Sequence, residues 1–170
     1  MSTYVLIEKY TVGAGGVSSV TLGSGGTIPQ TYTDLLVKCS TRSNLTASAG
    51  GAALEIKLNS TGASTYLKLE GSGSAASSNA AYQYANAEPS DFTSNVFGNS
   101  EFYLPNYKSS DKKSVTVDSV GENNATLAYC SLNALLFNVT TAITSLTFNP
   151  LTSYSFVQYS TFYLYGILKA

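Results

Sequence analysis

Residues 113–137 place the strongest constraint on the fold, because they are predicted to form a long β-hairpin. In the first arm, Val115 and Val117 alternate with polar residues, which is the period of two expected of a half-buried strand. Between the arms, Gly121 and Asn123 are residue types that tolerate the positive φ of a tight connection. In the second arm, alternate positions share one face, namely Ala128, Cys130, Leu132, Ala134 and Leu136.

A helix over residues 125–137 is the competing prediction, since the run is rich in Ala and Leu. The same run also holds Thr, Tyr, Cys, Ser and Asn, which are weaker helix formers. We therefore favour the strand and expect the rest of the chain to supply strands beside this hairpin or loops attached to it.

A second hairpin is predicted before it. Residues 53–59 alternate cleanly, with Leu54, Ile56 and Leu58 expected to point inward, and a Gly-bearing turn joins them to a matching run at 64–71. In the second run we expect Leu67 and Leu69 to point inward. The outward positions are then Tyr66, Lys68 and Glu70.

The remaining strands predict the fold class. They are expected at 4–12, 17–22, 31–40, 101–107, 142–150 and 155–168. The first and last are apolar on both faces, so we expect cover on two sides of each. Residues 71–98 are predicted as one long irregular loop. Nine or ten short strands with turn residues between them indicate one all-β domain, residues 1–170, built as an antiparallel β-sandwich and, among sandwiches, as a jelly roll.

The low charge of the chain indicates what it associates with. Only 11% of residues are charged, against roughly 25% in typical soluble domains, which favours a protein that works inside an assembly. A net charge of −1 with nine Lys and Arg gives no phosphate-binding surface, so we expect no nucleic-acid partner. The N-terminal residues lack the pattern of a signal peptide. No apolar run has the length of a membrane span, so we expect no membrane partner.

The side chains present argue against catalysis. The chain has no histidine, which excludes a histidine triad, a histidine-anchored zinc site and a histidine base. Glu88 and Asp91 are close enough in sequence to hold a cation, but a turn or a helix cap explains them more simply. We predict no catalytic, metal-binding or cofactor-binding residue, and a carboxylate-dependent glycan hydrolase ranks last. Cys39 and Cys130 are interpreted as small buried apolar residues rather than as a disulfide.

The aromatic residues are the better functional signal. Thirteen tyrosines offer large contact area at low entropic cost. The last strand is read either as an intersubunit face or as a tyrosine-rich sheet packed under a loop. The candidate oligomer interface comprises Tyr4, Leu6, Tyr159, Tyr163, Tyr165 and Ile167. The candidate partner or glycan contacts in loops, which partial burial against the sheet would also explain, are Tyr82, Tyr84, Phe92, Phe97 and Tyr107.

Several short segments of the sequence resemble those of a known group of proteins. They are TVGAGGVSSVTL, IPQTYTDLLVKCSTR, EFYLPNY, DSVGENNA, AITSLTF and FVQYSTFYLYGI. Together they resemble structural proteins of tailed bacteriophages of the marine and cyanobacterial type. The resemblance implies a virion component, and it transfers no functional residue because each phrase is a strand pattern.

The resemblance leaves two roles open. The favoured one is a non-catalytic capsid decoration, or cement, protein that binds the major capsid protein as a homo-oligomer, expected to be a trimer. It would reside on the capsid surface after synthesis in the host cytoplasm, with strands 4–10 and 157–167 as the trimer contact. The alternative is a tail-fibre or head-fibre tip that recognises host glycans through the loop aromatics.

Overall fold

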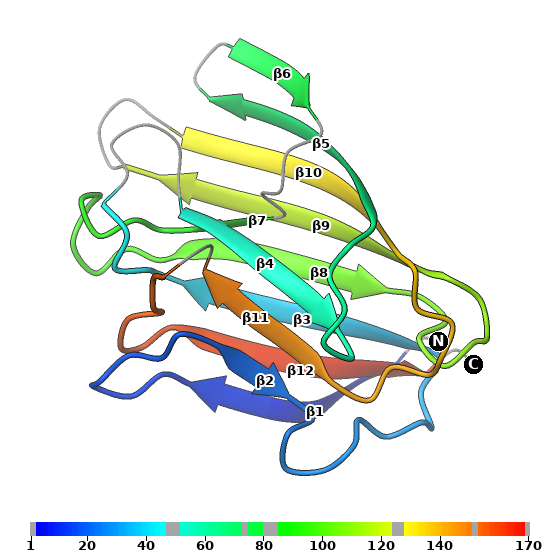
Figure 1. Ribbon diagram of the computed structural model, residues 1–170. Helices are drawn as coiled ribbons and strands as arrows, with labels where there is room; N and C mark the ends of the chain where they lie inside the picture. Colours follow the sequence, from blue (N-terminus) through cyan, green and yellow to red (C-terminus); the bar gives the residue numbers. More distant parts are fainter. Residues whose placement is uncertain are drawn as a thin grey trace.

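The computed structural model describes residues 3–46, 52–72, 75–79, 85–123, 128–150 and 153–168. In these residues the chain forms two antiparallel sheets and no helix (Figure 1). The larger sheet contains, in spatial order, β1 (Thr3–Thr11), β12 (Thr161–Leu168), β3 (Asp34–Thr41), β8 (Gly98–Leu104), β9 (Lys113–Glu122), β10 (Ala128–Phe137), β5 (Thr65–Ser72) and β6 (Ala75–Asn79). The smaller sheet contains β2 (Val20–Leu22), β11 (Leu146–Pro150), β4 (Ala52–Leu58) and β7 (Ala85–Ala87). The predicted all-β sandwich is confirmed.

The strand order divides the larger sheet into two halves. Its first four strands, β1-β12-β3-β8, together with β2-β11-β4-β7 of the smaller sheet, have an order compatible with the eight-stranded jelly roll. The other four strands, β9, β10, β5 and β6, extend the larger sheet, and we call them the wing. Each half of the wing is a hairpin inserted in a different connection of the sandwich, and the two hairpins meet where β10 pairs with β5.

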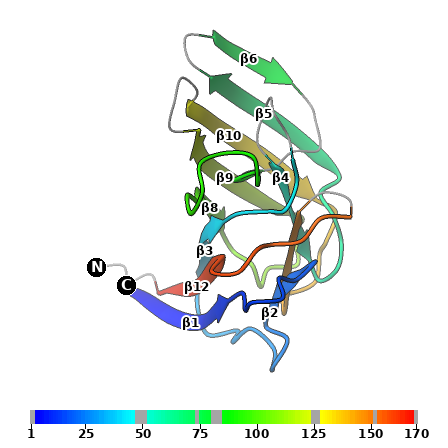
Figure 2. The same ribbon diagram turned by 90° about the vertical axis from the view of Figure 1, so that its left-hand side faces the viewer.

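The core lies between the two sheets. Figure 2 shows the smaller sheet on one side of the larger sheet. A chain of aromatic rings joins the layers: Phe148 of β11 is 5.2 Å from Phe102 of β8 and 5.4 Å from Phe162 of β12, measured between ring centroids. Phe156 is 5.1 Å from Phe162 in the same way. The contacts of Phe148 with Phe102 and of Phe156 with Phe162 are edge-to-face, an arrangement that stabilises a core beyond the burial of its area.

The predicted hairpin at residues 113–137 is confirmed, and the helix alternative is wrong. Strands β9 and β10 pair in register from Lys113–Phe137 to Glu122–Ala128. The inner face of the hairpin places Val115, Val117 and Leu135 in the core. Because side chains alternate across a strand, the small and apolar residues that share a face from 128 to 136 point outward.

Several predicted boundaries require correction. The strands predicted at 17–22, 31–40 and 101–107 begin at Val20, Asp34 and Gly98. Residues 71–98 are not one irregular loop, because β5 runs to Ser72 and β6 and β7 follow. The last strand begins at Thr161 rather than at 155, since a turn precedes it. The strand predicted at 142–150 is formed only by Leu146–Pro150.

The prediction that Leu67 and Leu69 point inward is wrong. Leu67 is 54% exposed and Leu69 is 50% exposed, whereas Lys68 between them is only 3% exposed. The cause is the pairing of β5 with β10, which aligns Leu69 with Leu132 on the outer face. A period of two shows which residues share a face, but it does not show which face meets the core.

Both cysteines are free. Cys39 is buried, as predicted, and burial raises the pKa of its thiol. Cys130 is exposed on the outer face of β10, so its prediction as a buried residue is wrong. It belongs to the alternate set of β10 that faces away from the smaller sheet.

Candidate functional site

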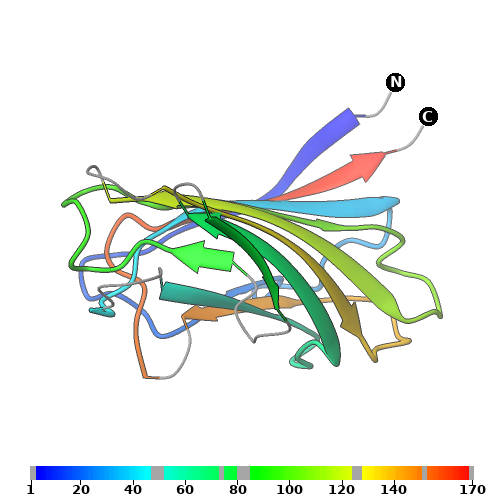
Figure 3. The same cartoon turned by 90° about the horizontal axis from the view of Figure 1, so that it is seen from above.

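The outer face of the larger sheet is the candidate functional surface. In the view of Figure 3 the smaller sheet lies below the larger one, and none of the described strands lies above it. Apolar side chains are exposed at both ends of this face. We expect such a face to be a contact surface, because monomers seldom leave large contiguous apolar areas in water.

The first apolar area lies on the wing. We define the leucine patch as Leu67, Leu69, Val120, Leu132 and Leu136, whose side chains are 38% to 54% exposed. The strand register makes it continuous, since Leu132 of β10 is aligned with Leu69 of β5 and Leu67 with Ala134. On the other side of β10, Val120 of β9 is aligned with Cys130.

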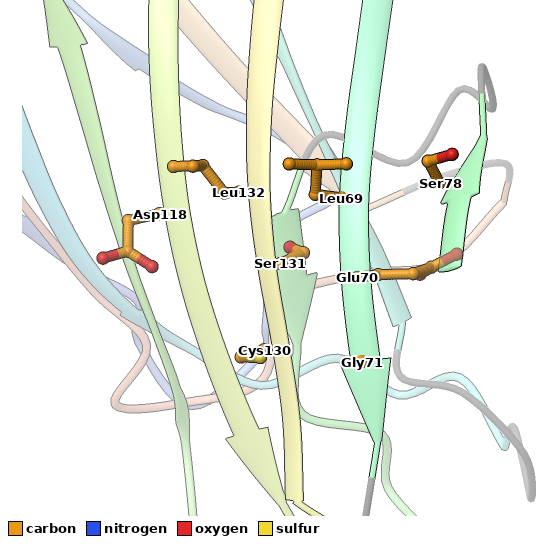
Figure 4. Close-up of a pocket in the computed structure, with 8 residues that line it drawn as sticks. All are labelled: Leu69, Glu70, Gly71, Ser78, Asp118, Cys130, Ser131 and Leu132. Atoms are coloured by element: carbon orange, nitrogen blue, oxygen red, sulfur yellow. The ribbon is translucent and has the colours of Figure 1, made fainter. Parts of the chain in front are cut away.

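A shallow hollow of about 600 Å³ lies within this area (Figure 4). Leu132 and Leu69 lie side by side on neighbouring strands, with Asp118 on one flank and Ser78 on the other. The small residues Gly71 and Cys130, aligned with each other, form the lower part of the hollow. Its lining offers carboxylate, thiol and hydroxyl groups and no cation, so it suits an apolar side chain better than an anionic ligand.

The second apolar area lies at the chain ends. We define the terminal patch as Tyr4, Leu6, Tyr163, Tyr165 and Ile167. Tyr4 is aligned with Ile167, and Leu6 with Tyr165. Tyr4 and Leu6 are 60% and 51% exposed, while Ile167 is nearly buried. Figure 3 shows the ends of β1 and β12 projecting beyond the body of the sandwich. The outer cover expected for β1 is therefore absent from the described part of the chain.

Tyr159 does not join the terminal patch. It lies in a turn before β12, with a φ of 72°, at the opposite end of that strand from Ile167. The structure thus brings together five of the six residues predicted for the oligomer interface.

Polar residues separate the two patches. The Nζ atom of Lys38 lies 3.0 Å from a carboxylate oxygen of Glu101, and the hydrogen bond of this pair raises the pKa of Lys38. Asp118 is aligned with Glu101 on the next strand. Nearby, the Tyr103 hydroxyl donates to Asp34 at 2.8 Å, and burial together with this bond raises the pKa of Tyr103 to about 12. The two patches are therefore distinct apolar areas on one sheet.

The loop aromatics do not form one platform. Tyr107 is completely buried and donates its hydroxyl hydrogen to the carbonyl of Pro29. Phe97 precedes β8 and Tyr107 follows it, so the two lie at opposite ends of that strand. Phe92 and Phe97 are half-buried, and Tyr82 and Tyr84 lie outside the described residues. Tyr107 as a partner contact was a wrong prediction.

A buried arginine that the sequence did not single out organises the loop before β8. The guanidinium of Arg42 donates to four carbonyls, those of Thr93 at 2.6 Å, Val96 at 2.8 Å, and Ser90 and Phe92 at 3.0 Å each. Charge-assisted bonds of this kind are stronger than neutral ones. Arg42 therefore fixes the loop, and a lone arginine in the sequence gives no signal of that role.

Glu88 is buried at the junction of the sandwich and the wing. It is 1% exposed, and its Oε1 atom has no hydrogen-bond partner in the described residues. Gly121 and Gly98 make room for it, since a Cβ on either would lie 2.9 Å or 3.3 Å from Oε2. Burial raises the pKa of Glu88 to about 7. Glu88 points inward while Asp91 lines a surface hollow, so they do not form the cation site considered from the sequence.

Other classes of site lack support in the described residues. Within them, no group of three or more His, Cys, Asp and Glu residues is placed to hold a metal ion. The described segments also contain no helix with the length and apolar character needed to cross a membrane. No protein-family model, no curated protein and no solved structure matches the chain.

Proposed function

We propose that this protein is a non-catalytic decoration protein of a bacteriophage capsid, bound to the outer surface of the shell as a homotrimer. The observation that carries the proposal is the outer face of the larger sheet, which exposes two apolar patches with a polar strip between them. The resemblance of the sequence to phage structural proteins is the reason for proposing a phage capsid as the particle to which it binds. A chain with only 11% charged residues is consistent with a protein that functions within an assembly.

The terminal patch is the proposed trimer contact. Tyr4 and Leu6 are each more than half exposed and stand on strands that project from the body (Figure 3). A neighbouring copy, or the shell built by the major capsid protein, would bury them. Each contact is small, but several contacts in one oligomer raise the effective concentration of the others, so the assembled coat binds more tightly than one chain does.

The fibre-tip alternative has less support, because those of its proposed glycan contacts that the structure describes do not assemble. Tyr107 is inaccessible, and Phe97 lies at the far end of the same strand. Sugar-binding sites place exposed aromatic rings side by side, an arrangement missing from the described loops.

The proposal is tested by locating the protein in electron-microscopy maps of the virus particle that carries it. We expect its density at regular positions over the capsid lattice, in threefold clusters. Density confined to the tail or to fibres would contradict the decoration role and favour the fibre tip. As a second measurement, Leu6→Glu should reduce recovery of the protein on purified particles at least tenfold, while Lys57→Gln, in β4 of the smaller sheet and away from both patches, should leave it unchanged.

A further inference from the structure

One end of the wing is inverted relative to an ordinary half-buried sheet, whereas Val115, Val117 and Leu135 nearer its other end point into the core. On the outer face of the wing stand the leucine patch, Ala134 and Cys130. On the inner face of the same strands stand Lys68, Ser119, Ser131 and Asn133, all buried. Alternating strands normally place their apolar residues toward their own core. Because the leucines of the wing are exposed, their burial against another protein surface would be favourable.

The outward residues of β10 alternate between small and large side chains. When the strand is reversed, each large residue therefore takes the position of a small one. From one end to the other the outward residues are Cys130, Leu132, Ala134 and Leu136. They alternate small, large, small, large. If a second β10 lies over the first in the reverse direction, every large side chain meets a small one.

We propose that the leucine patch binds a second copy of itself, face to face, about a two-fold axis that crosses β10 between Leu132 and Ala134. Leu132 of each copy then packs on Ala134 of the other. Leu136 of each copy enters the hollow formed by the other copy's Gly71 and Cys130. Such an isologous contact is the commonest form of homo-oligomer interface, and two packed sheets have nearly aligned strands.

The flanking strands fit the same arrangement. On β5, Leu69 of one copy meets Leu67 of the other. On β9, the Asp118 carboxylate of one copy lies opposite Thr116 of the other, whose hydroxyl is a donor. The same axis brings Glu101 of β8 over the other copy's Tyr103. The reason is that Glu101 is aligned with Asp118, and Tyr103 with Thr116, on the neighbouring strand β9. No two like charges meet across this contact.

The composition of the leucine patch favours a protein over a lipid surface. It contains no Lys or Arg, whereas surfaces that lie on anionic membranes are rich in both. Its five side chains expose on the order of 400 Å² per copy, in the range of functional patches but below the ~800 Å² per partner of a standard interface. The contact is therefore reversible on its own and becomes stable where copies are concentrated, as in a coat. It goes beyond the proposed function and does not require the virion.

The test is a cysteine trap in the purified full chain. In the dimer, Leu136→Cys places a thiol against the native Cys130 of the other copy. Mild oxidation should then yield a covalent dimer in which Cys130 is linked to the introduced thiol, shown by non-reducing electrophoresis and mass spectrometry. Within one chain the two positions are six residues apart on a strand, roughly 20 Å, too far for a disulfide. Cys39 is buried and does not compete.

Two controls make the trap specific. Leu136→Cys combined with Cys130→Ser should lose at least nine-tenths of the covalent dimer, and Leu6→Cys, a more exposed position in the terminal patch, should form no link to Cys130. Leu132→Asp should abolish concentration-dependent dimerisation in sedimentation, with unchanged circular dichroism. Disulfides formed only between identical positions would overturn the proposal. So would a chain that stays monomeric at millimolar concentration and gives no trapped dimer, and the leucine patch would then be assigned to contact with the shell protein. Since no particle is used, this failure is distinct from a failure of the decoration role.

Discussion

The sandwich half of the larger sheet and the far end of the wing use the same strand pattern with opposite orientation. In the sandwich half, Phe102 and Phe162 point into the core and the Lys38–Glu101 pair faces solvent. At the far end of the wing, Lys68 and Asn133 are buried while Leu69 and Leu132 face solvent. The sandwich half contributes to the core between the sheets, as do Val115 and Val117 of the wing, but Lys68 and Asn133 are buried outside that hydrophobic core.

The difference separates residues that stabilise the chain from residues that serve its contacts. Burying a large apolar side chain contributes about 1.5–3 kcal/mol, and in the sandwich half this burial occurs within one molecule. For the exposed leucines of the wing the same gain is available only when another surface covers them. Substitutions should therefore affect folding in one half and association in the other.

The largest effect is expected in the core of the sandwich half. Phe148→Ala removes the ring that contacts both Phe102 and Phe162 and leaves a cavity between the sheets. We expect a loss of about 3–5 kcal/mol in the free energy of unfolding, measured by urea denaturation. A loss below about 1 kcal/mol would contradict the assignment of this ring cluster as the centre of the core.

The next effect concerns Glu88, at the junction of the sandwich and the wing, and is measured as the pH dependence of the unfolding free energy. The folded-state pKa of Glu88 is about 7, raised from 4.5 by burial, so its neutral form stabilises the fold fully below pH 4.5 and this stabilisation is lost as the pH rises to 7. The change amounts to at most about 3 kcal/mol. Glu88→Gln should remove this part of the pH dependence of the unfolding free energy, and the exposed control Glu101→Gln should retain it. An unchanged slope between pH 4.5 and 7 in Glu88→Gln would show that another group is responsible.

A smaller effect is expected for the ion pair on the outer face of the sandwich half. Both partners are about half exposed, and exposed pairs contribute roughly 0.2–1 kcal/mol. Lys38→Ala should lower the unfolding free energy by no more than this amount, less in high salt. A double-mutant cycle with Glu101→Ala measures the coupling directly, and a coupling above about 2 kcal/mol would mean that this face is not in water.

The smallest effect on the isolated chain is expected on the wing. Leu69→Thr keeps a good strand former on an exposed position, so the unfolding free energy of the dilute, monomeric protein should change by less than about 0.5 kcal/mol. The matched change on the inner side of the sandwich half, Val37→Thr, buries a hydroxyl and should cost about 1–3 kcal/mol. Equal losses for the two would remove the contrast between the halves.

The sequence predicts the strands of this fold better than their orientation. The alternation at Val115 and Val117 identified the central hairpin, and the alternation over residues 53–59 identified the inward Leu54, Ile56 and Leu58. The same pattern failed at Leu67 and Leu69, because both faces of that strand are plausible until its neighbour is known. The terminal patch was anticipated from its aromatic residues. Arg42 and Glu88 were missed as structural centres, since their roles depend on carbonyls and glycines that come together only in three dimensions.

The edge-to-edge joining of the two inserted hairpins has a consequence for the order of folding. The pairing of β10 with β5 closes a long loop, because β6, β7, β8 and β9 lie between them in the chain. Contacts between distant segments form late, since the loop entropy must first be overcome. We expect the wing to assemble after the sandwich and to open before it, so that amide protons of β5 exchange with solvent while those of β3 and β12 remain protected.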